Sequence, residues 1–77
     1  MKKIQILGTG CAKCGKLYEN SQKVVVENNI EAEVSKVEDL TEIMKFGVMI
    51  TPALAIDGKV VVSGKVPSPD ELINYFS

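Results

Sequence analysis

The chain begins with a short apolar run, Lys3 to Leu7, which ends at the glycine-rich segment Gly8-Thr9-Gly10. A run of this kind predicts a buried strand. After Cys11, apolar side chains recur at helical spacing as far as Asn28, which predicts a helix with one apolar stripe. The stripe contains Cys14, Leu17, Tyr18, Ser21, Val24, Val25 and Asn28. We expect Asn28-Asn29 to end this helix, because asparagine tolerates the left-handed backbone of a C-cap.

The middle of the chain predicts a second strand and a short helix. Residues 31–37 alternate, and one face of that strand would carry Ala32, Val34 and Lys36. Asp39 is suited to cap the helix, with Glu42 three residues later as in a capping box. Gly47 would end it. The apolar side of this helix would consist of Leu40, Ile43 and Met44.

The last third of the chain predicts a hairpin and a final helix. Two apolar runs, Ala53–Ile56 and Lys59–Ser63, are separated by Asp57-Gly58, a strong signal for a two-residue turn. After a loop at 64–67, Ser68-Pro69-Asp70-Glu71 supplies a cap residue, a proline at the first helical position and an acid at the third. The final helix would pack through Leu72, Ile73, Tyr75 and Phe76.

The predicted order is therefore βαβαββα, an α/β fold. The first half should form a parallel β-α-β unit and the second an antiparallel hairpin followed by a helix. Together they would give a four-stranded mixed sheet with helices on both faces. A chain of 77 residues has room for one domain, so we expect residues 1–77 to form it alone.

Composition removes several function classes. The net charge is −1, which gives no general attraction to nucleic acid or to an anionic membrane. The chain has no histidine, so it lacks the usual general base and the commonest metal ligand. It also has no arginine, which argues against bidentate recognition of phosphate or carboxylate groups. The apolar part of residues 1–7 is too short for a signal peptide, and no segment is long enough for a membrane span. We therefore expect a cytoplasmic protein.

The candidate chemistry lies in Cys11-Ala12-Lys13-Cys14, between the first strand and the first helix. Cys11 would lie at the helix N-terminus, where unpaired N–H groups and the helix dipole stabilise a thiolate. Its pKa should therefore lie below the usual thiol value of about 8.5. Cys14, one turn later, should point inward. The pattern predicts that Cys11 attacks a substrate disulfide and that Cys14 resolves the mixed disulfide. A bridge between them closes too small a loop to add much stability.

A CxxC pair has other uses, and two of them are poorly supported here. A zinc or iron–sulfur site needs about four Cys or His ligands, and the chain has two cysteines and no histidine. Two buried cysteines without a role are also possible, although this pair follows a glycine-rich loop. We expect no cofactor and no bound metal.

A copper(I) chaperone module is the main alternative function. Such domains carry a CxxC after a similar loop, and soft thiolates suit copper(I). Their order is βαββαβ, with a strand last, whereas this chain predicts a helix last. A redox-sensing interaction module, using the same two cysteines, is a third possibility.

Thr51-Pro52 stands before the strand Ala53–Ile56. Proline is tolerated at the first residue of a strand, so it can be a plain structural proline or a cis-proline that faces the site.

Together with the CxxC, the Asp57-Gly58 hairpin and the last helix, this proline makes the chain resemble the thioredoxin-like superfamily. The small archaeal and bacterial redox-active disulfide proteins are the most similar in length. The resemblance implies a nucleophile at Cys11, a resolving cysteine at Cys14 and a cis-proline at Pro52 facing Cys11. It also implies that the backbone of Thr51 pairs with substrate.

The motif departs from the family in two ways. Thioredoxins resemble Trp-Cys-Gly-Pro-Cys at the motif, whereas in this chain Gly10 precedes Cys11. Thioredoxins also keep a buried carboxylate in the strand that leads to the motif, whereas residues 1–10 of this chain contain no acid. The resemblance does not imply that this chain binds glutathione, because the chain has neither the glutaredoxin motif nor an arginine. The expected substrate is a disulfide in a protein or a small molecule, with an unidentified reductase, and the expected state is a monomer. The surface of this protein that binds the substrate would comprise Gly8-Thr9-Gly10, Ala12, Lys13, Thr51-Pro52 and the loop at Gly64.

Overall fold

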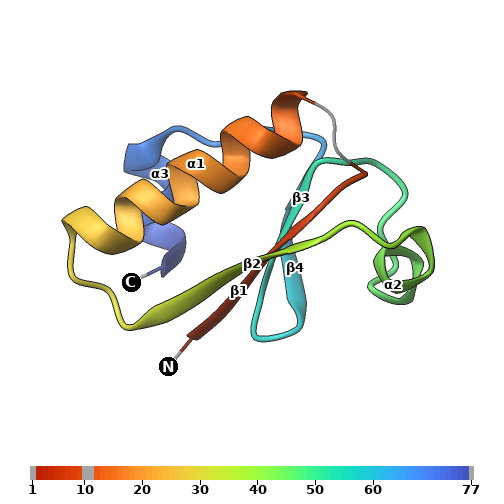
Figure 1. The fold of residues 1–77 in the computed structure, drawn as a ribbon, viewed down its shortest axis with the longest axis horizontal. Coiled ribbons are helices and arrows are strands. Elements are labelled where there is room, and N and C mark those ends of the chain that lie inside the picture. Colours follow the sequence, from red (N-terminus) through yellow and green to blue (C-terminus); the bar gives the residue numbers. More distant parts are fainter. Residues whose placement is uncertain (1, 10–11, 77) are drawn as a thin grey trace.

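The computed structural model describes residues 2–9 and 12–76, and this part of the chain has the predicted order βαβαββα (Figure 1). The elements are β1 (Lys2–Leu7), α1 (Ala12–Glu27), β2 (Ala32–Val37), α2 (Leu40–Lys45), β3 (Ala53–Ile56), β4 (Lys59–Ser63) and α3 (Pro69–Phe76). The last element is a helix and not a strand. The βαββαβ order of the copper-chaperone alternative is therefore wrong for this chain.

The four strands form one mixed sheet in the order β2-β1-β3-β4. Strand β1 pairs parallel to β2 and antiparallel to β3, and β3 pairs antiparallel to β4. This confirms the parallel first half and the antiparallel second half of the predicted fold. Strands β1 and β3 are central, and their buried side chains belong to both faces of the sheet, namely Ile4, Ile6 and Leu54 on one and Leu7, Ala53 and Ala55 on the other.

Helices α1 and α3 lie next to each other over one face of the sheet (Figure 1). The core on this face contains Ile4, Ile6, Leu17, Val24, Leu54, Val62, Leu72 and Phe76. Ala32 and Val34 pack against it, and the ammonium group of Lys36 lies 4.6 Å from the centre of the Tyr18 ring. The predicted face of β2 is thus confirmed, and the stripe of α1 is buried at Cys14, Leu17, Ser21 and Val24.

The short helix α2 covers the other face with a smaller core. Its buried cluster consists of Leu7, Ile43, Ala53 and Ala55. Of the three residues on its predicted apolar side, only Ile43 is buried, whereas Leu40 is 63% exposed and Met44 is 66% exposed. The apolar side of this short helix thus lies mostly in solvent, and only Ile43 reaches the small cluster that contains Ala53 and Ala55.

The predicted turn and the caps at Asp39 and Ser68 are present, but the Glu42 side chain contacts Lys45 and does not complete a capping box with Asp39. Asp57 and Gly58 have φ angles of 53° and 84°, as a two-residue hairpin turn between β3 and β4 requires. Asn29 has a φ of 51° just after α1, which confirms the predicted C-cap region. Ser68 and Glu71 bond each other reciprocally at the start of α3, with the Glu71 N–H donating to the Ser68 hydroxyl at 3.4 Å and the Ser68 N–H donating to the Glu71 carboxylate at 3.3 Å.

Candidate active site

Three loops meet at the end of the sheet where β1 finishes. The Gly8 N–H donates to the Val37 carbonyl at 3.0 Å, which continues the β1–β2 pairing by one residue. Leu7 pairs with Ala53 in the antiparallel register, so the next positions along β1 and β3 are Gly8 and Pro52. The Gly64 N–H in turn donates to the Pro52 carbonyl at 2.8 Å. Gly8, Pro52 and Gly64 therefore form one row across this end of the sheet.

Cys14 lies in the first turn of α1, directly over this row. Its side chain is 6% exposed, which confirms the prediction that it points inward. A Cβ placed on Gly8 would overlap the Cys14 Sγ and would lie 3.1 Å from the Cys14 Cβ. The sulfur of Cys14 is thus beside the backbone at the end of β1. Cys11 and Gly10, the other predicted site residues of this segment, lie outside the described residues.

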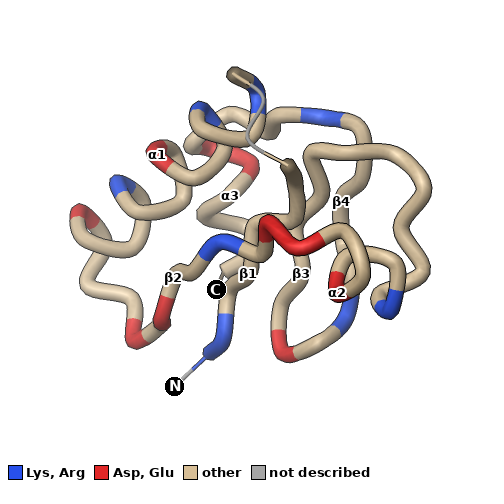
Figure 2. Tube along the Cα trace, turned by 45° about the vertical axis from the view of Figure 1, so that its right-hand side comes forward, with Lys and Arg blue, Asp and Glu red and all other residues tan. Residues whose placement is uncertain are grey.

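Ala12 and Lys13 open α1, and both side chains are exposed. The first turn of α1 contains no acidic residue, while Lys13 and Lys16 supply positive charge. Elsewhere, lysines and acidic residues are interspersed along the chain (Figure 2). The start of α1 therefore favours an anion both through its unpaired N–H groups and through its side-chain charges.

The Thr51–Pro52 peptide bond is cis, as the family resemblance implied. Thr51 is exposed, whereas Pro52 is almost completely buried. Before them, Met49 is 97% exposed and Ile50 is 63% exposed. The part of this loop that a substrate could touch is therefore Thr51 and its two predecessors, and not the proline ring.

Two features differ from the predicted substrate surface. Gly8 is buried, so it faces the Cys14 sulfur and is not open to another backbone. Gly64 is exposed, but the Ile50 side chain lies against it, since a Cβ on Gly64 would come within 2.8 Å of the Ile50 Cγ2. The sequence carries no signal for the contact between Gly64 and Ile50. For the contact between Gly8 and Cys14, the available signal was that a glycine ends the strand at a position where the chain makes no turn.

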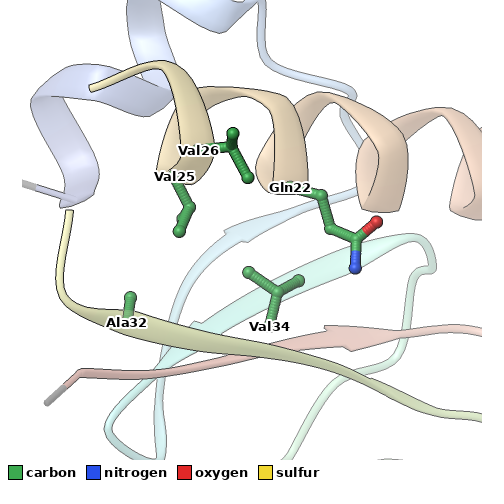
Figure 3. A pocket seen from close by; sticks show the side chains of 5 residues that line it. All are labelled: Gln22, Val25, Val26, Ala32 and Val34. Atoms are coloured by element: carbon green, nitrogen blue, oxygen red, sulfur yellow. The ribbon is translucent and has the colours of Figure 1, made fainter. Parts of the chain in front are cut away.

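A separate hollow lies beneath the second half of α1, between this helix and the edge strand β2 (Figure 3). It has a volume of about 270 Å³ and is lined by Gln22, Val25, Val26, Ala32 and Val34. Gln22 lies eight positions after Cys14, which corresponds to about 12 Å along a helix. The hollow is therefore separate from the cysteine site.

In residues 2–9 and 12–76, no helix is long and apolar enough to cross a membrane. The same part of the chain contains no cluster of three or more His, Cys, Asp or Glu side chains arranged to hold a metal ion.

Comparison with known proteins gives consistent results. The thioredoxin domain family matches residues 2–77. The chain is 42% identical over 77 residues to a thioredoxin of Methanothermobacter thermautotrophicus, and this match covers 100% of both chains. It is 48% identical over 69 residues to a thioredoxin of Methanocaldococcus jannaschii, covering 90% of this chain and 79% of the relative. With its βαβαββα fold and its CxxC at the start of α1, the chain belongs to the thioredoxin domain family of thiol–disulfide oxidoreductases.

Proposed function

We propose that this oxidoreductase performs reversible dithiol–disulfide exchange with Cys11 as the attacking and Cys14 as the resolving cysteine. The observation that carries the proposal is the position of Cys14, which is buried in the first turn of α1 against the end of β1. Cys11 directly precedes this turn in the sequence. Only Ala12 and Lys13 separate the two cysteines, which allows their sulfurs to bond with a small rearrangement.

The reaction has two displacement steps. The Cys11 thiolate attacks one sulfur of the substrate disulfide, which forms a mixed disulfide and releases the first substrate thiolate. Cys14 then loses its proton and attacks the Cys11 sulfur, which forms the Cys11–Cys14 disulfide and releases the second thiolate. Overall the protein loses two electrons and two protons, and the substrate disulfide gains both to become two thiols.

The surroundings of α1 support Cys11 as the attacking group. Unpaired N–H groups at a helix start stabilise a thiolate, and Lys13 and Lys16 add positive charge without a nearby acid in the first turn. Cys14 is one turn further into the protein, so an external disulfide has less access to its sulfur.

The substrate would be held by Gly10, Ala12, Lys13 and Thr51, while the buried Pro52 would support Thr51 without touching the substrate. The exposure of Ala12, Lys13 and Thr51 supports this assignment, and Pro52 would act by placing Thr51 at the end of the sheet. Thioredoxins act on disulfide substrates together with a reductase. For this chain we propose a protein or small-molecule disulfide, a separate reductase, and a monomer that works as one domain in the cytoplasm, where an accessible CxxC is kept reduced.

The test compares two single-cysteine variants. Cys14→Ser should accumulate a stable mixed disulfide through Cys11, because no group remains to resolve it. Cys11→Ser should be inert toward the same disulfide and should react slowly with alkylating agents at neutral pH. Mass spectrometry after exposure to a small disulfide reads both outcomes. Adducts that form preferentially on Cys14 would overturn the roles, and tight copper(I) retention without any exchange would overturn the function.

A further inference from the structure

The backbone conformation at position 8 does not require a glycine. Gly47, Gly58 and Gly64 have φ angles of 77°, 84° and 74°, where an L side chain is strained. Gly8 is not among the glycines with positive φ, and it closes a regular strand through its bond to Val37. An alanine could adopt this backbone, so the reason for a glycine must lie in its surroundings.

Among the described residues, the side chain that lies where a Gly8 side chain would point is that of Cys14. The atoms that a Cβ on Gly8 would meet within 4 Å are the Cys14 Sγ, which it would overlap, and the Cys14 Cβ at 3.1 Å. The sulfur therefore occupies the space that a side chain at position 8 would fill. Gly15, the neighbour of Cys14 on α1, is different, because a Cβ there would meet none of the described residues within 4 Å.

We propose that Gly8 is a positioning residue for the resolving step, because its missing side chain lets the Cys14 sulfur sit at the end of β1. The proposal rests on the proposed function, in which Cys14 attacks the Cys11 sulfur of the mixed disulfide. An alanine methyl at position 8 would force the Cys14 sulfur to move by about 1 Å or more to restore normal contact. A displacement of about 1 Å between reacting groups can cost on the order of a hundredfold in rate.

The two displacement steps respond differently to this change. The first step uses only the Cys11 sulfur and the substrate. Among the described residues, a methyl at position 8 would meet Cys14 within 4 Å and neither Ala12 nor Lys13. The second step requires the Cys14 sulfur to approach the Cys11 sulfur along the line of the breaking bond. A side chain at position 8 should therefore slow resolution and leave attack unchanged.

A chromogenic aromatic disulfide separates the steps, because each step releases one coloured thiolate. In stopped-flow mixing with the reduced protein, Gly8→Ala should slow the second release by about ten- to a hundredfold and keep the first within about threefold. Gly15→Ala is the matched control and should keep both phases within about threefold. A second phase in Gly8→Ala as fast as in the unchanged protein would overturn the proposal.

Thermal unfolding tests the contact itself. Overpacking at Gly8→Ala should lower Tm by about 5–20 °C. In a Cys14→Ala background the sulfur is absent, so the same substitution should lower Tm by less than half as much; an equal loss in both backgrounds would overturn the proposal. This comparison also holds if Gly8→Ala alone does not fold.

The same assay distinguishes this proposal from the proposed function. Cys14→Ser should show the first release only, and if it shows both releases then the resolving role of Cys14 itself is wrong. If Cys14→Ser behaves as expected while Gly8→Ala matches the unchanged protein, only the positioning role of Gly8 is wrong.

Discussion

The two faces of the sheet are covered very differently. The α1 and α3 face buries eight large or medium apolar side chains in one cluster, including Phe76 and Leu17. The α2 face buries four residues, of which Ala53 and Ala55 are small. Since apolar stabilisation scales with buried area, most of the stability of this domain should come from the first face. The geometry of the cysteine site can then rest on α1, while α2 and the loop after it remain exposed.

The exposed residues follow the same division. Leu40, Met44, Met49 and Ile50 all belong to α2 or to the loop that leads to Thr51-Pro52, and each is at least 63% exposed. On the other face, the exposed large apolar side chains of the described helices are Val26 of α1 and Tyr75 of α3. The side of the molecule that carries Thr51 is thus the more thinly packed side. Four stability measurements test this comparison.

Phe76→Ala should have the largest effect. Phe76 is 1% exposed in the larger core, and removing a buried phenylalanine typically costs about 3–5 kcal/mol. A domain of this size is stable by only on the order of 5–10 kcal/mol, so the variant should be close to unfolding. Urea denaturation measures the loss. Tyr75→Ala is the control on the same helix, with a side chain that is 40% exposed, and a loss no larger in Phe76→Ala than in this control would contradict the comparison.

Ile43→Ala should cost less, about 2–3 kcal/mol, because the short helix α2 can move toward the sheet and reduce the cavity. Ile43 is 2% exposed, whereas its neighbour Met44 is 66% exposed. Met44→Ala is therefore the control and should change the free energy of unfolding by less than about 0.5 kcal/mol. If Ile43→Ala destabilises the protein as much as Phe76→Ala, the two faces contribute equally and the comparison fails.

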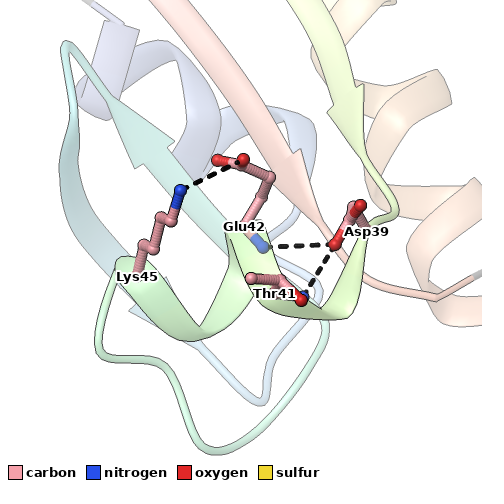
Figure 4. Close-up of polar contacts among 4 residues, drawn as sticks. All are labelled: Asp39, Thr41, Glu42 and Lys45. Atoms are coloured by element: carbon pink, nitrogen blue, oxygen red, sulfur yellow. Dashed lines mark hydrogen bonds and ion pairs between the residues drawn. The ribbon is translucent and has the colours of Figure 1, made fainter.

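Asp39→Ala should cost about 1 kcal/mol. The Asp39 carboxylate accepts bonds from the Thr41 N–H at 2.8 Å and the Glu42 N–H at 3.4 Å at the start of α2 (Figure 4). Glu42 is directed instead to Lys45, at 3.4 Å, so the cap acts through Asp39 and not as a reciprocal box. Amide hydrogen exchange should quicken in α2 and stay unchanged in α1. Asp39→Asn keeps an acceptor and should retain most of the protection; equal losses in both variants would count against the cap.

Ser21→Ala should have the smallest effect and the opposite sign. Ser21 is fully buried in the α1 face, and its hydroxyl has no hydrogen-bond partner among the described residues. Burying an unsatisfied hydroxyl is unfavourable, and alanine is the better helix former, so we expect a gain of about 0.5–1 kcal/mol. Chemical denaturation measures it, with the exposed Lys23→Ala on the same helix as the control. A loss of stability in Ser21→Ala would mean that the hydroxyl is satisfied.

Much of this protein could be predicted because its signals are local. The Asp57-Gly58 turn, the caps at Asp39 and Ser68 and the stripe of α1 each depend on residues close together in sequence. The exposure of Leu40 and Met44 could not be predicted in this way. An apolar spacing shows which residues share a side of a helix, but how many of them reach the sheet depends on what the sheet offers, and here it offers Ala53 and Ala55.

The sequence by itself determined the order of elements, the position of the CxxC before the first helix and the inward orientation of Cys14. Each of these follows from the pattern of neighbouring residues within one short segment. Only the tertiary structure decided that Gly8, Pro52 and Gly64 form one row and that the Cys14 sulfur fills the space above Gly8. These contacts join positions from 6 residues apart (Gly8 and Cys14) to 44 residues apart (Gly8 and Pro52). They depend on strand register and on the distance between α1 and the sheet, which packing of the whole domain sets.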